Sequence, residues 1–187
     1  MPDDKIKIQD TRSNVSSTKK LHSEVDRDKL NSIITESVKE GVNPFTALAI
    51  AMKESRFGAS RPDYGVDHYP PLEETDTLQK YETLSREVSS WSPEKLFVKT
   101  LKNKLDYGKR LGYKDNLHQI QAFNGLGYNP LYKANMKQNP LYAKEIVDIQ
   151  ENVMKKNPTV NELVGEAMRN NMLESLQKNY EPPKFNF

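Results

Sequence analysis

The segment GVNPFTALAIAMKESRFG, residues 41–58, decides the fold of this 187-residue chain. Asn43 is a favourable N-cap residue and Pro44 a favourable first residue of a helix, so a helix is predicted over residues 44–57. Apolar residues occupy most faces of this segment, which predicts a helix that runs through the middle of the domain. Gly58 is expected to end the helix.

One carboxylate interrupts this apolar segment. Ala47, Ile50, Glu54 and Phe57 share one stripe of the helix surface, because they follow one another at helical spacing. Burial disfavours the charged form of a carboxyl group, so we expect Glu54 to stay protonated near neutrality, as a general acid for a glycosidic oxygen must. The alternative is an exposed and inert glutamate in the last helical turn, since glutamate is seldom buried without a partner.

The rest of the chain between its two ends is also predicted to be helical. Leu30, Ile33, Ile34 and Val38 have helical spacing, and Gly41 is placed to end that helix. No segment shows the alternation expected of a strand, so we expect an all-α fold. Further helices are predicted near residues 72–89, 93–111, 116–123 and 141–156, and a capping box of Thr159 and Glu162 is expected to begin the last helix.

Composition divides the chain into three expected parts. Residues 1–22 are polar and are predicted to form a flexible arm, residues 23–178 the helical domain, and residues 179–187, which contain two consecutive prolines, a short non-helical tail. The 28 basic residues against 26 acidic residues argue against a strong nucleic-acid-binding surface.

Several other classes of protein are disfavoured by the sequence. The chain has no cysteine, which excludes disulfides and thiolate metal sites. His22 and His118 have no partner at metal-ligand spacing, so neither a metal nor a cofactor is expected. No apolar run approaches the roughly 20 residues of a membrane span, and the first residues lack the apolar core of a signal peptide, so we expect neither.

The central segment resembles the first motif of lytic transglycosylases and related lysozyme-like muramidases. The matching residues are Gly41, Val42 and Pro44 before the helix, and Glu54, Ser55 and Phe57 at its end. The resemblance implies a lysozyme-like helical fold over about residues 28–157. It also implies that Glu54 is the single catalytic acid/base and that Ser55 contributes to substrate binding.

Two later segments agree with this resemblance. Residues 122–127 read AFNGLG and are similar to the family's second motif, which implies that Phe123, Asn124 and Gly125 line the substrate cleft opposite the glutamate. Tyr142 matches the tyrosine that the family places at the start of the next helix. An ordinary half-buried core tyrosine is the alternative interpretation of Tyr142.

The chain also departs from the family's pattern. The family's Gly-Leu-Met-Gln-x-x-Pro loop is matched only by residues 65–71, GVDHYPP, where Asp67 replaces the methionine and His68 the glutamine. Phe123 stands where the family usually has tyrosine. These changes alter the polar groups that the resemblance places near Glu54.

The expected function is therefore cleavage of peptidoglycan between N-acetylmuramic acid and N-acetylglucosamine. The product is either a 1,6-anhydro end, as in a lytic transglycosylase, or a hydrolysed end if Asp63 or Asp67 activates water. The protein is expected to act at the bacterial cell wall, either as a bacteriophage endolysin or virion component or as an exported bacterial enzyme. The alternatives are a catalytically weakened glycan-binding or virion structural module, and a helical interaction protein. Trp91, Tyr64 and Tyr69 are expected either to stack on sugar rings or to anchor the core and loops.

Overall fold

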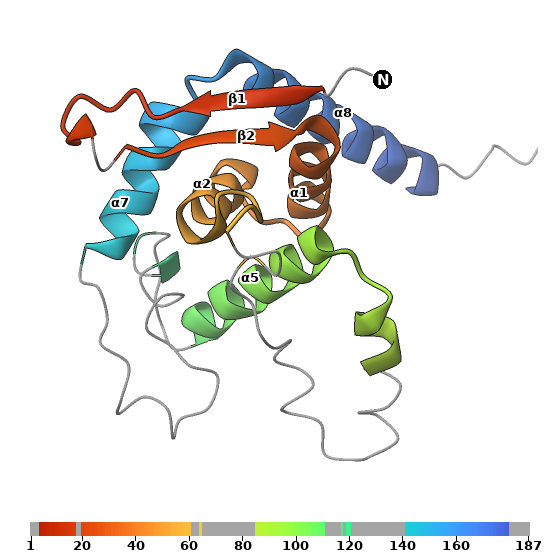
Figure 1. Ribbon diagram of the computed structural model, residues 1–187. Helices are drawn as coiled ribbons and strands as arrows, with labels where there is room; N and C mark the ends of the chain where they lie inside the picture. The colour runs from red at the N-terminus through yellow and green to blue at the C-terminus, as the bar shows by residue number, and fades with distance from the viewer. Residues whose placement is uncertain are drawn as a thin grey trace, which may run out of the picture.

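The computed structural model describes residues 4–17, 20–60, 64, 85–110, 117, 119–120 and 141–179. This part of the chain is mainly helical and carries one two-stranded sheet (Figure 1). The strands are β1 (Lys5–Gln9) and β2 (His22–Asp26). The helices are α1 (Arg27–Lys39), α2 (Pro44–Ser55), α5 (Pro93–Arg110), α7 (Tyr142–Ile149) and α8 (Pro158–Asn179), with a π-helical turn, η3 (Gln150–Met154), directly after α7.

Helix α2 lies at the centre of the molecule, as its apolar sequence predicts. It packs against α1, α7 and η3, and every residue from Thr46 to Met52 is buried. The predicted cap is confirmed: the Asn43 Oδ1 atom accepts hydrogen bonds from the backbone N–H groups of Phe45 at 3.0 Å and Thr46 at 3.3 Å. The helix ends at Ser55, two residues earlier than predicted, because the backbone becomes left-handed at Arg56.

Helix α1 connects most of the other elements. Its buried face contains Leu30, Ile33 and Ile34, and it packs against α2, α5 and α8. Gly41 follows the end of α1 with a φ of 68°, the left-handed conformation that favours glycine at a helix end. The sequence-based predictions of this helix and of its end are therefore confirmed.

The N-terminal segment is a β-hairpin that packs on the helices. The prediction of a flexible arm over residues 1–22 is wrong for residues 4–17 and 20–22, and so is the prediction of no strand. β1 and β2 are antiparallel, with Ile6 opposite Val25 and Ile8 opposite Ser23. Ile6, Ile8 and Val25 are buried in the common core, while the residues between them face solvent. The strand forms because these few apolar side chains alternate with charged ones and lose their water contact on the helices.

A buried ion pair fastens the hairpin to α7. Arg12 donates from Nε and Nη2 to the two carboxylate oxygens of Asp10, at 2.8 and 2.6 Å, and from Nη1 to Asp148 at 3.2 Å. The side chains of Asp10 and Arg12 are 0% and 2% exposed. Burial alone would raise the pKa of Asp10, but hydrogen bonds from Arg12 and from the Leu21 and Arg12 backbone outweigh burial and lower the pKa to about 2.

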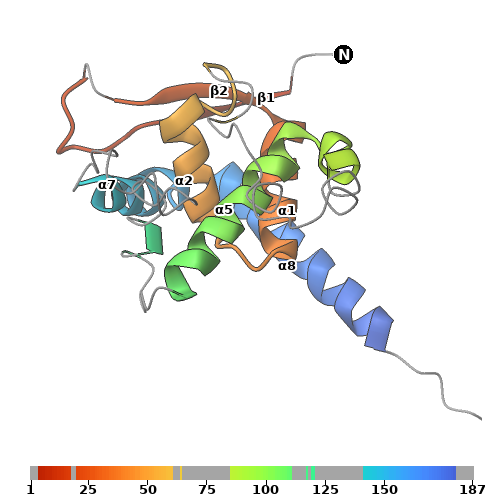
Figure 2. The ribbon, with the colours of Figure 1, turned by 90° about the horizontal axis from the view of Figure 1, so that it is seen from below.

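Helix α8 has a packed half and a projecting half. The Asn157 Oδ1 atom accepts a hydrogen bond from the Val160 N–H, so Asn157 caps the helix in place of the predicted capping box. Figure 2 shows that the C-terminal half of α8 extends away from the other helices. The first half of α8 buries Val160, Leu163, Val164 and Ala167, whereas the second half exposes Met168, Met172, Leu173 and Leu176.

None of the described helices is long and apolar enough to cross a membrane.

Candidate functional site

Glu54 lies in the last turn of α2, where the most buried of the described helices reaches the surface. Its side chain is partly buried. Glu54 therefore belongs to a helix held on most sides by the core, which restricts the positions that its carboxylate can take.

The backbone directly after Glu54 adopts an unusual turn. Arg56, Phe57 and Gly58 all have positive φ, at 49°, 57° and 83°. The left-handed conformation costs about 1–2 kcal/mol for each residue with a side chain, so Arg56 and Phe57 must be held there by their surroundings. The Phe57 N–H donates to the Ala51 carbonyl at 3.1 Å, and the Phe57 side chain is buried. Strained turns of this kind are concentrated at functional sites.

Ser55 stabilises this turn from inside the protein. Its hydroxyl donates to the Ala51 carbonyl at 2.9 Å and accepts from the Gly58 N–H at 2.9 Å. Ser55 is 0% exposed, so it is out of reach of a ligand on the surface. The substrate contact implied by the resemblance does not fit this position, and Ser55 instead acts as a support for the turn that follows Glu54.

Tyr142 approaches Glu54 from a neighbouring helix. It is the first residue of α7, which packs against α2, and it is 2% exposed. Its pKa is raised above the ordinary value for tyrosine, by burial first and then by the nearby charge of Glu54. The buried hydroxyl therefore lies close enough to the Glu54 carboxylate for the two groups to interact electrostatically.

Lys53, the residue before Glu54 on α2, forms an ion pair with a different carboxylate. Lys53 Nζ lies 2.9 Å from Glu145 Oε2 on α7, which leaves Glu54 without this neighbour as a counterion. In the part of the chain that the structure describes, no cation forms an ion pair with Glu54.

Tyr64 anchors the chain after the turn. Its hydroxyl donates to Glu94 Oε1 on α5 at 2.9 Å, its ring stacks on Phe97 with 5.2 Å between ring centroids, and the ring lies where a side chain at Gly58 would point. Burial, followed by the charge of Glu94 and the hydrogen bond to it, raises the pKa of Tyr64. Of the two roles considered for Tyr64, the structure supports loop anchoring. Glu94 was not predicted, because only the tertiary contact distinguishes it from any acidic residue in a first helical turn.

The structure describes three of the eight predicted site residues and brings Glu54 and Tyr142 together. Trp91 is half-buried on the surface, with the ammonium groups of Lys95 and Lys99 at 5.0 and 5.7 Å from its ring centroid. Within the described residues, no cluster of three potential metal ligands occurs. The predicted residues Asp67, His68, Phe123, Asn124 and Gly125, as well as Asp63 and Tyr69, lie outside the described part.

The described elements define a mainly helical protein with a carboxylate at the end of its central helix and a buried tyrosine near that carboxylate. Comparisons of the chain with models of protein families, with curated proteins and with solved structures found no significant match.

Proposed function

We propose that this protein cleaves the glycan strands of bacterial peptidoglycan with Glu54 as the acid/base. The observation that carries the proposal is the position of Glu54, partly buried in the last turn of the central helix and near the buried Tyr142. The motif around Glu54 and the position of Tyr142 are the features that first suggested a resemblance to lytic transglycosylases. The strained turn that begins at Arg56 supports the same location for the site.

The proposed reaction begins with transfer of a proton from Glu54 to the glycosidic oxygen between N-acetylmuramic acid and N-acetylglucosamine. The bond from the muramic C1 to this oxygen breaks, and the acetamido oxygen of the same sugar bonds to C1. This substrate-assisted step replaces the second carboxylate that most glycosidases use.

Glu54, now a carboxylate, acts as a base in the second step. It removes the proton from the muramic 6-hydroxyl, whose oxygen attacks C1 and displaces the acetamido oxygen. A 1,6-anhydro ring results, and Glu54 regains its proton. If water attacks C1 in place of the 6-hydroxyl, the product is a hydrolysed reducing end. Tyr142 contributes by holding the carboxylate in one orientation through both steps.

Mass spectrometry of the fragments released from purified sacculi tests this proposal. Wild-type protein is expected to release disaccharide–peptide fragments whose ends are lighter by one water than hydrolysed ends. The control for Glu54→Gln is Glu162→Gln, which changes an exposed glutamate on α8. This control variant is expected to give the same fragments as wild type. If the wild-type protein binds sacculi but releases no sugar fragments, the protein is a glycan-binding module and the proposal is wrong.

A further inference from the structure

A hollow lies beside the candidate site, between the N-terminal hairpin and α7. It has a volume of about 580 Å³, within the range of small-ligand sites, and the segment of residues 12–16 forms one wall. The opposite wall is the outer side of α7, from Leu141 to Asp148. This hollow exists because the N-terminal segment packs on α7, and that segment lies outside the resemblance to the transglycosylase family.

The floor of the hollow is a built and rigid structure. Arg12 is 2% exposed and is held by the two oxygens of Asp10 and by Asp148. Asp148 also accepts a hydrogen bond from the Asn152 side chain at 2.7 Å. The charges of Arg12, Asp10 and Asp148 on the floor are therefore paired with one another within the protein.

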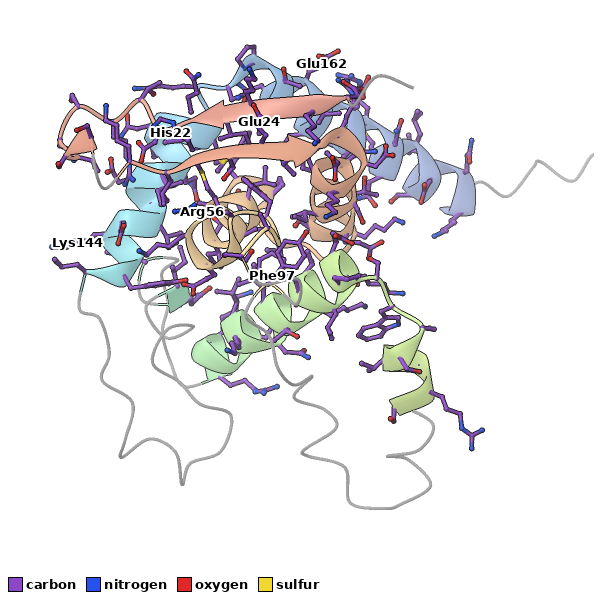
Figure 3. All side chains as sticks on the ribbon, viewed as in Figure 1. His22, Glu24, Arg56, Phe97, Lys144 and Glu162 are labelled. Carbon is purple, nitrogen blue, oxygen red and sulfur yellow. The ribbon has the colours of Figure 1, made fainter. Side chains whose placement is uncertain are left out.

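The rim carries a positive charge that no described residue balances. Lys144 is exposed, has no ion-pair partner among the described residues, and points away from the helical core on the outer side of α7 (Figure 3). Leu141, 61% exposed, and Val15 lie on the same hollow. A ligand that fits these walls combines a carboxylate with small apolar groups.

The hollow is directly connected to the candidate site. Glu145 lines the hollow and also pairs with Lys53, the residue before Glu54. Tyr142, which is buried near Glu54, lies one helical turn before Glu145 on α7. A glycan held at Glu54 would therefore have the first turn of α7 close by.

We propose that this hollow binds the peptide stem of peptidoglycan, with a stem carboxylate paired to Lys144 and alanine methyl groups against Leu141 and Val15. This inference rests on the proposed function, because it takes the polymer at Glu54 to be peptidoglycan. It assigns the N-terminal hairpin a role in recognition of the peptide branch, beside the cleavage of the sugar chain.

Calorimetric titration with a synthetic stem peptide, which carries a free glutamate carboxylate and alanine residues, tests the inference. Wild type and Glu54→Gln are expected to bind this peptide equally. Lys144→Glu is expected to bind about tenfold more weakly, which corresponds to about 1.4 kcal/mol. Lys178→Glu, an exposed lysine in the last turn of α8, is the matched control and is expected to bind as wild type does.

The failure of this inference and the failure of the proposed function give different results. Absence of peptide binding by wild type, or equal binding by Lys144→Glu, would overturn the stem-binding site even if sacculi are cleaved. Peptide binding that depends on Lys144 would support the stem-binding site even if no glycan is cleaved. The absence of cleavage would then count only against the proposed role of Glu54.

Discussion

Two carboxylates of this protein, Asp10 and Glu54, differ in how far they are buried and in how many partners they have. Asp10 is completely buried and accepts four hydrogen bonds, two of them from the guanidinium of Arg12. Glu54 is only partly buried and lies near Tyr142, while the lysine next to it is paired with Glu145. A carboxylate saturated with partners stabilises a fold, whereas one that has no ion pair among the described residues and lies at a surface turn is a candidate for chemistry. The comparison predicts that changes at Asp10 affect stability and that changes around Glu54 affect activity.

The largest effect on stability is expected from Asp10→Asn. This change leaves the Arg12 charge buried without its main counterion, which costs about 3–5 kcal/mol of unfolding free energy. Urea denaturation followed by circular dichroism measures it. Glu24→Gln, which removes an exposed ion pair of the same hairpin, is expected to cost at most about 1 kcal/mol. Equal losses for the two variants would show that the buried pair contributes no more than a surface pair.

Low pH is expected to remove the contribution that the Asp10 carboxylate makes to the stability of the fold. The pKa of Asp10 is lowered from 3.8 to about 2 in the folded protein, so its contribution to stability is present above about pH 4 and is lost as the pH falls toward 2. The shift corresponds to about 2 kcal/mol. The difference in unfolding free energy between wild type and Asp10→Asn should therefore narrow between pH 5 and pH 2, when both are measured by urea denaturation. A constant difference over this range would contradict the assigned pKa.

A smaller effect on stability is expected from a change near the Glu54 end of α2. Tyr142→Phe removes the hydroxyl buried near the carboxylate and is expected to lower the cleavage rate about tenfold, with a stability change of at most about 1 kcal/mol. Thr46→Val removes another buried hydroxyl, which donates to Gln150 Oε1 at 2.6 Å near the other end of α2. Thr46→Val should cost similar stability but leave the cleavage rate unchanged. Equal rates for the two variants would remove Tyr142 from the proposed site.

The elements predicted correctly are those whose signals are local. The cap at Asn43, the apolar content of α2 and the spacing of Leu30, Ile33 and Ile34 each determine structure within one helix, and the structure contains them. The hairpin was missed because β1 is a short strand in which only Ile6 and Ile8 face the core, a pattern hidden by the charged and polar residues around it. Its stability comes from contacts with helices far along the chain.

The candidate site shows the same division between local signals in the sequence and contacts made only by the fold. Glu54 was identified from its position on an apolar helix, and Tyr142 from a resemblance in the spacing of motifs. The contacts that hold them in place could not be read from the sequence. Arg56 and Phe57 give no local sign of a left-handed backbone, and the pairs Tyr64–Glu94 and Lys53–Glu145 join residues that only the fold brings together.

The most direct test of the central claim is the rate at which Glu54→Gln clears a suspension of purified sacculi. The account predicts that the rate falls by about 10²–10⁴-fold, the usual contribution of a general acid–base group, because the amide cannot transfer the proton. Thermal unfolding should show that the variant is folded and about as stable as wild type. Clearance by a folded Glu54→Gln protein at the wild-type rate would contradict the account.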